Sequence, residues 1–149
     1  MFLRKQTARV GTWSTGLSFH PNSPHSEAGT AVWWNYFTYS SLGIRVSKVD
    51  PSKRVLRYRP ANGNEVLVGL ETKNDEVKLV IRCEGEKYNF GFAEGNLGET
   101  QWISDISTEE MTVDPPVGAA FTGMMLGLYA FGELEGCLVP ADFKYAVFD

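Results

Sequence analysis

Aromatic residues that could bind a saccharide are concentrated in the segment 27–46, EAGTAVWWNYFTYSSLGIRV. Two adjacent tryptophans in it are followed within six residues by two tyrosines and a phenylalanine. Saccharides are recognised by aromatic rings laid against the apolar faces of pyranoses, with a few polar side chains beside them in a shallow site. The segment therefore predicts an aromatic platform for a sugar, with the candidate ligand-binding residues Trp34, Asn35, Tyr36, Tyr39 and Arg45.

The two adjacent tryptophans must have different roles if this segment is extended. Successive residues of a strand point to opposite faces, so Trp33 and Trp34 cannot both enter one hydrophobic core. The alternation shows only that the two rings lie on opposite faces of the strand. It does not show which of them faces the core. Most aromatic residues of a β-sandwich belong to its core, and we expect this of Trp13, Phe19, Phe90, Phe121 and Phe143.

Acidic residues are the other side chains with chemical potential, because a glycosidase works with a pair of carboxylates. Such a pair lies about 5 Å or about 6.5–9.5 Å apart across a cleft, a separation that sequence spacing cannot show. Solvated surface charge is the better account of the acids that might pair, which are Glu27, Glu84, Glu86, Asp105, Glu109 and Glu110. His20 and His25 flank the turn-like PNSP and are expected to be loop residues.

Motifs of the common catalytic and metal sites are missing from the sequence. It has no glycine-rich phosphate loop, no G-x-S-x-G elbow and no H-E-x-x-H helix, and its two histidines have no metal-ligand spacing. The net charge of −4 disfavours nucleic acid and anionic membranes as partners, because both need a basic patch. We expect a protein without catalytic activity or cofactor, which binds a neutral ligand or none.

Alternation of apolar and polar residues dominates the chain and predicts β-strands. The segments 27–35 and 41–47 are predicted to form a hairpin, and 121–131 and 141–149 to be the closing strands. No window of helical length has a 3.6-residue apolar period. The prediction is one all-β domain over residues 1–149, a sandwich or barrel of short antiparallel strands. Two series are expected to face inward, Trp13, Thr15, Leu17 and Phe19, and Val77, Leu79, Ile81 and Cys83.

Two further expectations concern single residues. The segment 94–118 is rich in Gly, Pro and acids, and it is expected to be irregular, with at most one short strand and Trp102 as its large anchor. Cys83 continues an inward series, so we expect a buried free thiol and not a disulfide with Cys137. A domain of 149 residues is large enough to fold without a covalent link.

Five blocks of the sequence carry a family likeness in their order and spacing. They are FLRKQ at 2–6, W-x-x-x-L-x-F-x-P from Trp13 to Pro21, EAGTAVWWN…Y…LGIR from Glu27 to Arg45, FTGMMLGLYA at 121–130 and PADFKY at 140–145. Over its whole length the chain resembles the C-terminal β-sandwich of fungal glycoside hydrolase family 43 β-xylosidases and α-L-arabinofuranosidases. The resemblance implies a concanavalin A-like jelly roll of two antiparallel sheets.

The resemblance also implies a function for the whole chain. The five-bladed propeller that carries the catalytic acids of those enzymes has no counterpart here, so none of their catalytic residues has a position in this sequence. What is implied is a carbohydrate-binding module or lectin for neutral, xylan-type β-linked glycans, or else a structural domain that packs on the propeller. Such a chain would be extracellular as part of a secreted hydrolase. It would be cytosolic as a free-standing lectin, since it begins without the apolar stretch of a signal peptide.

The resemblance bears on the two tryptophans and on the first strand. Family members usually carry Tyr, Phe or Trp at the place of Trp33 and varied residues at that of Trp34. This implies that Trp33 packs in the core and that Trp34 faces a ligand. Arg4 and Gln6 recur in the RKQ block and are expected to be structural.

A structural calcium ion is a further implication, because concanavalin A-like sandwiches often hold one. Asp142 and Asp149 are the candidate ligands in this sequence. Isolated aspartates are a weak signal for a site that needs six to eight oxygen ligands.

Overall fold

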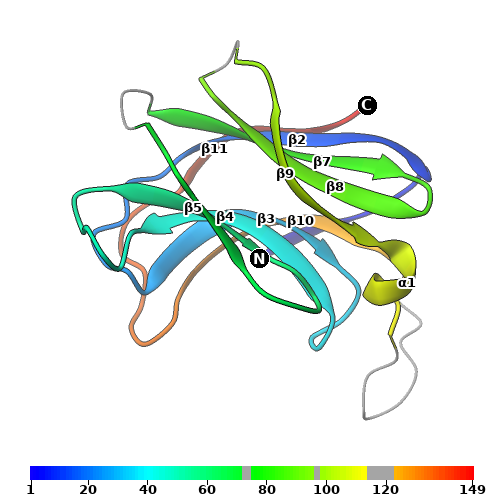
Figure 1. Ribbon diagram of the computed structural model, residues 1–149, viewed down its shortest axis with the longest axis horizontal. Helices are drawn as coiled ribbons and strands as arrows, with labels where there is room; N and C mark the ends of the chain where they lie inside the picture. The colour runs from blue at the N-terminus through cyan, green and yellow to red at the C-terminus, as the bar shows by residue number, and fades with distance from the viewer. Residues whose placement is uncertain (72–74, 96–97, 114–122) are drawn as a thin grey trace.

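The computed structural model describes residues 1–71, 75–95, 98–113 and 123–149, and it consists of two antiparallel sheets packed face to face (Figure 1). Within these residues, the six-stranded sheet has the order β1-β10-β3-β4-β5-β6, formed by Phe2–Lys5, Met125–Gly132, Ser26–Trp33, Tyr39–Val46, Arg54–Arg59 and Val66–Gly69. The five-stranded sheet has the order β11-β2-β7-β8-β9, formed by Asp142–Phe148, Val10–Ser18, Glu76–Glu84, Lys87–Glu94 and Gln101–Ser107. The expected sandwich of two antiparallel sheets is confirmed.

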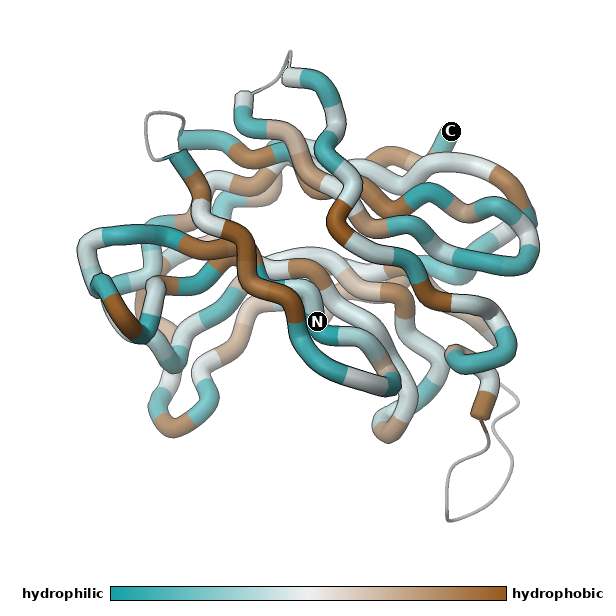
Figure 2. The backbone as a smooth tube through the Cα atoms, viewed as in Figure 1, coloured by the Kyte–Doolittle hydropathy of each residue, from teal (hydrophilic) through white to brown (hydrophobic). Residues whose placement is uncertain are grey.

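The core lies between the two sheets and is formed by every second residue of the strands. Figure 2 shows the corresponding alternation of hydrophobic and hydrophilic residues along the backbone. Trp13 is only 1% exposed, and Phe19 and Phe90 are buried as expected. Phe143 packs against the core from its edge, and Phe121 lies outside the described residues. Both predicted inward series, on β2 with the residue after it and on β7, are buried.

A short chain of hydrogen bonds links the two sheets through the core. The Trp13 indole Nε1 on β2 donates to the Thr30 hydroxyl on β3 at 2.8 Å. The Thr30 hydroxyl then donates to the backbone oxygen of Gly127 on β10, also at 2.8 Å. Buried polar groups cost free energy unless they are paired. The two hydrogen bonds pair the indole N–H and the threonine hydroxyl, so both groups can lie in an apolar core.

Cys83 is a buried free thiol, as its place in the inward series of β7 predicted. Burial raises its pKa from 9.0 to about 12, because the thiolate would lose its hydration between the sheets. Cys137 is also a free thiol and is partly exposed.

The segment after β8 is more regular than expected. It contains the full strand β9, which pairs with β8, and the single helical turn α1, Thr108–Met111. The Ser107 side chain and the Glu110 carboxylate cap α1 reciprocally. The ring of Trp102 is 42% exposed on the outer side of β9 and stacks with Arg82 at 4.4 Å, so it is not an interior anchor.

Candidate functional site

A hollow of about 500 Å³ lies on the outer face of the six-stranded sheet, and it is the candidate functional site. On β3 the residues Ala28 and Val32 point into the core, so Glu27, Ala31 and Trp33 point outward. The middle of the outer face is built from small residues, which leave room between larger side chains at its two ends. These small residues come from three neighbouring strands and are Gly29, Ala31, Ser41, Gly43 and Gly127.

A column of stacked side chains forms one wall of the hollow. Trp33 and Tyr39 are register partners on β3 and β4, and their ring centroids are 5.3 Å apart at an interplanar angle of 27°. Tyr36 meets the Trp33 ring edge-on at 5.5 Å, and the Arg59 guanidinium lies 4.3 Å from the centre of the Tyr39 ring. Three neighbouring strands and one turn thus present a continuous aromatic and cationic surface. Tyr129 and Phe131 of β10 form a second stack across the hollow, with centroids 5.8 Å apart.

The structure contradicts the expected role of Trp33. Trp33 is half-buried on the outer face and lines the hollow, so the prediction that it packs in the core is wrong. Its parity is fixed by Ala28 and Val32, which occupy the inward positions of β3. Trp34 follows the last residue of β3, and its backbone N–H donates to Thr38 O at 3.1 Å within the turn. The ring contacts that form the aromatic column are those of Trp33 with Tyr39 and with Tyr36.

Tyr36 and Tyr39, two of the predicted site residues, both line the hollow. Two others, Asn35 and Arg45, make contacts that hold the fold together. The Asn35 side-chain oxygen accepts from the N–H groups of Phe37 and Thr38 at 2.8 and 3.0 Å, which fixes the turn. That turn leaves Tyr36 85% exposed. Arg45 is only 4% exposed, and its guanidinium donates to the backbone oxygen of Pro24 and to Glu133.

Glu27 is a buried carboxylate at the base of the hollow and not the solvated surface charge that we expected. It is 1% exposed, accepts from the Tyr129 hydroxyl at 2.6 Å and accepts from Arg57 Nη1 at 3.0 Å. Arg45 Nη1 lies 3.7 Å from the same carboxylate. A buried charge is tolerated only when it is paired and hydrogen-bonded. Two donors, from β10 and β5, and the nearby charge of Arg45 on β4 fulfil this condition.

Gly43 makes the contact between Tyr129 and Glu27 sterically possible. A Cβ atom at Gly43 would lie within 2.9 Å of the Glu27 carboxylate and closer still to the Tyr129 hydroxyl. The tyrosine ring therefore reaches across the sheet only because β4 has no side chain at this position. Sequence reasoning included Gly43 in a strand but had no signal for this role.

The pKa shifts around the hollow follow from burial and from the paired charges. Burial raises the pKa of the Tyr129 hydroxyl well above its usual value, and the neighbouring Glu27 charge raises it further. Burial would raise the pKa of Glu133, but the charge of Arg45 and hydrogen bonds from His25 and Arg45 outweigh this, so the pKa is lowered. The tyrosine is thus neutral and the carboxylate ionised near neutral pH, and the hollow offers fixed hydrogen-bonding groups beside aromatic rings.

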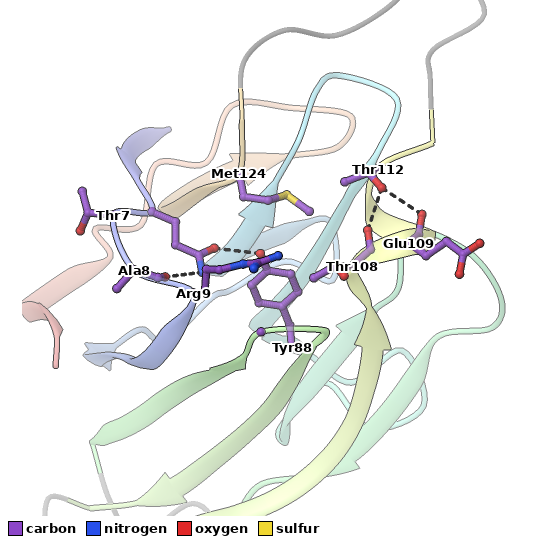
Figure 3. A pocket seen from close by; sticks show the side chains of 10 residues that line it. Thr7, Ala8, Arg9, Tyr88, Thr108, Glu109, Thr112 and Met124 are labelled. Carbon is purple, nitrogen blue, oxygen red and sulfur yellow. Dashed lines mark hydrogen bonds between the residues drawn. The ribbon is translucent and has the colours of Figure 1, made fainter.

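A second hollow, of about 570 Å³, lies at one end of the sandwich near α1 (Figure 3). The Tyr88 hydroxyl donates to Gln6 Oε1 and Gln6 Nε2 donates to Ala8 O, both at 2.8 Å. The Thr112 hydroxyl donates to Thr108 O at 2.9 Å. These polar groups are engaged with one another, in agreement with the structural role expected of Gln6. No stacked ring pair lines this hollow among the described residues, which makes it the weaker candidate.

Comparison with known proteins identifies the family. A family model described as the beta xylosidase C-terminal concanavalin A-like domain matches residues 1–149. The chain therefore belongs to this family, and the resemblance carried by the five sequence blocks is confirmed.

Solved structures with the same fold include enzymes much longer than this chain. A Bacteroides ovatus protein, Xyloglucan PUL GH43B, has a TM-score of 0.83 and 25% identity over 99% of this chain and 28% of its own. The xylan beta-1,4-xylosidase from Bacillus halodurans C-125 has a TM-score of 0.82 and 22% identity over 98% of this chain and 28% of its own. A functionally unknown protein from Saccharomyces cerevisiae has a TM-score of 0.71 and 12% identity, and the match covers 96% of this chain and 70% of that chain. The chain thus spans less than a third of the first two proteins.

Two other classes of site find no support in the part of the chain that the structure describes. Its only helix, α1, is far too short to cross a membrane. Within the described residues, no three His, Cys, Asp or Glu side chains come together in a way that would hold a metal ion. Neither Asp142 nor Asp149 belongs to such a group of three in these ranges.

Proposed function

We propose that this chain is a non-catalytic accessory domain that binds a saccharide in the outer-face hollow. The observation that carries the proposal is the Trp33–Tyr39 stack, which borders a hollow with Glu27 and Arg57 at its base. Aromatic rings supply a surface for the apolar face of a pyranose. Fixed polar groups accept hydrogen bonds from its hydroxyls and donate hydrogen bonds to them. A neutral, β-linked xylan-type chain is the favoured ligand, in keeping with the family of the domain.

Several properties of the hollow favour a saccharide over an apolar ligand. The carboxylate of Glu27 and the guanidinium of Arg57 hold each other at 3.0 Å, so they are positioned before any ligand arrives. Preorganised groups lose less conformational entropy on binding. Trp33 and Tyr39 are half-buried and paired, which fixes their ring planes in the same way.

The proposal is tested by isothermal titration with xylo-oligosaccharides of increasing length, together with a pull-down on insoluble xylan. Trp33→Ala is expected to abolish binding. Trp102→Ala is the matched control, because Trp102 is also a partly exposed tryptophan stacked on a neighbour, but on the other sheet. Full binding by Trp33→Ala, or loss of binding by Trp102→Ala alone, would contradict the proposed site.

Packing against a catalytic propeller is the second candidate function. It is favoured by the match of this chain to only 28% of the length of two much longer proteins. The β3–β4 turn offers a contact surface, since Tyr36 is 85% exposed and Phe37 is 59% exposed. If packing is the function, Phe37→Asp should weaken association with a separately expressed propeller in analytical ultracentrifugation. Saccharide binding without any such association would favour the first candidate.

A further inference from the structure

Arg59 is a cation on the wall of the outer-face hollow that has no carboxylate partner within 4 Å among the described residues. It lies on β5 opposite Ser41 of β4, and its guanidinium stacks on the ring of Tyr39. Its Nη1 atom is buried and, within the described ranges, has no hydrogen-bond partner. Stacking uses the flat face of a guanidinium and leaves the N–H groups at its edge free of that contact.

The other two arginines of this face have carboxylate partners. Arg57 Nη1 donates to Glu27 at 3.0 Å, and Arg45 Nη2 donates to Glu133 at 3.4 Å. The two carboxylates are thereby neutralised as well. Among the charged side chains that line the hollow, Arg59 is the one without a carboxylate within 4 Å in the described residues, and it borders the same hollow as the aromatic column.

We infer that the hollow selects saccharides that carry a uronic acid, whose carboxylate accepts hydrogen bonds from Arg59. This inference rests on the proposed function and adds one anionic substituent to the neutral chain proposed there. A carboxylate is planar and matches the parallel N–H groups of a guanidinium, whereas a hydroxymethyl group offers a single neutral oxygen. The sugar ring lies against the column of Trp33 and Tyr39, and its acid group reaches the guanidinium of Arg59.

The net charge of the chain does not oppose an acidic ligand at this position. The chain carries −4 overall, but charges separated by more than about 8–10 Å are largely screened at physiological ionic strength. Recognition is decided by the groups in contact, where Glu27 is already balanced by Arg57. A local cation with unused donors therefore selects the ligand.

The test compares three ligands by titration calorimetry on the full chain. They are a neutral xylo-oligosaccharide, the same oligosaccharide with one glucuronic acid branch, and the branched form after reduction of its carboxyl group to an alcohol. The acidic ligand is expected to bind about tenfold more tightly than the other two, which is the worth of one charge-assisted hydrogen bond. This preference should shrink as salt is raised, because the contact is ionic.

Variants then assign the preference to Arg59. Arg59→Gln should bind the acidic and the neutral oligosaccharides with equal affinity, so that the preference is lost. Arg82→Gln is the matched control, because Arg82 stacks on Trp102 at 4.4 Å on the other sheet, and it should keep the preference. A preference that survives in Arg59→Gln would overturn the inference. Equal binding of all three ligands by the natural chain would overturn it and leave the proposed function standing, and binding of none would overturn both.

Discussion

Trp33 and Tyr39 face each other across β3 and β4 on the outer side of the six-stranded sheet, with their ring centroids 5.3 Å apart. Such a pair is worth about 0.5–1.5 kcal/mol beyond the area it buries. Both rings remain half-buried, so they are held rigidly without being part of the core. Rigidity combined with access is what an aromatic binding surface needs.

Trp33→Ala is expected to cost clearly less folding stability than Trp13→Ala. Trp13 is 1% exposed and donates a hydrogen bond across the core, so its removal should cost about 3–5 kcal/mol. Trp33→Ala removes the ring contacts with Tyr39 and Tyr36 and a half-buried side chain, for which about 1–2 kcal/mol is expected. Urea denaturation of the two variants measures the difference, and equal costs would place Trp33 in the core after all.

Glu27→Gln is expected to destabilise the fold strongly. Glu27 is paired with Arg57 and Arg45 and is 1% exposed, so its loss leaves the two guanidinium groups with only the more exposed carboxylates of Glu65 and Glu133. Breaking a buried pair in this way costs about 3–5 kcal/mol. Glu65→Gln is the control, since Glu65 contacts the same Arg57 at 2.7 Å but is largely exposed, and about 1 kcal/mol or less is expected. Denaturant titration that finds the two variants alike would contradict the buried cluster.

Gly43→Ala is expected to break the hydrogen bond between Tyr129 and Glu27. The added methyl group would occupy the place of the Tyr129 hydroxyl, and displacing that donor leaves a buried carboxylate short of a partner, at about 1–3 kcal/mol. Gly69→Ala on β6 has open space around it, so a change within about 0.5 kcal/mol is expected there. Thermal unfolding compares the two, and a neutral Gly43→Ala would show that Tyr129 does not depend on the small residue.

Cys83 is expected to be unreactive toward thiol reagents at pH 8 in the folded protein. Its pKa is raised to about 12 by burial, and the thiolate is the reacting species. Titration with a disulfide reagent should therefore detect one thiol, that of Cys137, before unfolding and two thiols after it. Rapid reaction of both in the folded state would contradict the burial of Cys83.

The same pKa shift gives a pH dependence of stability. In the unfolded chain Cys83 loses its proton near pH 9.0, whereas in the fold it keeps it until about pH 12. The unfolded state therefore binds fewer protons between these values, and the free energy of unfolding should fall as pH rises above about 9. A Cys83→Ser variant, compared with the natural chain at pH 7 and pH 10, isolates this contribution.

The sequence predicted the fold well because strand periodicity is a local property. Alternation along β2 and β7 placed Trp13, Leu79 and Cys83 on the inward side, and the structure agrees. It could not choose between Trp33 and Trp34, since the residues before them are small or apolar on both faces of β3. The choice rests on which face receives the neighbouring sheet, and that is a property of the whole fold.

The candidate site was only partly predictable for the same reason. Tyr36 and Tyr39 lie in the segment that contains Trp33, and both line the same hollow. The partners of Glu27 are far away in sequence, since Tyr129 is 102 residues from it, and they meet because β10 lies beside β3. A strand order of this kind brings together residues whose spacing carries no signal, so Glu27 looked like surface charge.

The most direct test of the central claim follows the indole N–H signals of the four tryptophans by two-dimensional NMR during titration with xylohexaose. Trp33 lines the hollow, so its signal is expected to shift with saturable dependence on ligand. The buried Trp13 and the distant Trp102 should stay in place, and single Trp→Phe variants assign the signals. A saturable shift of Trp102 or Trp34 with no change at Trp33 would contradict a saccharide site on the outer face of the six-stranded sheet.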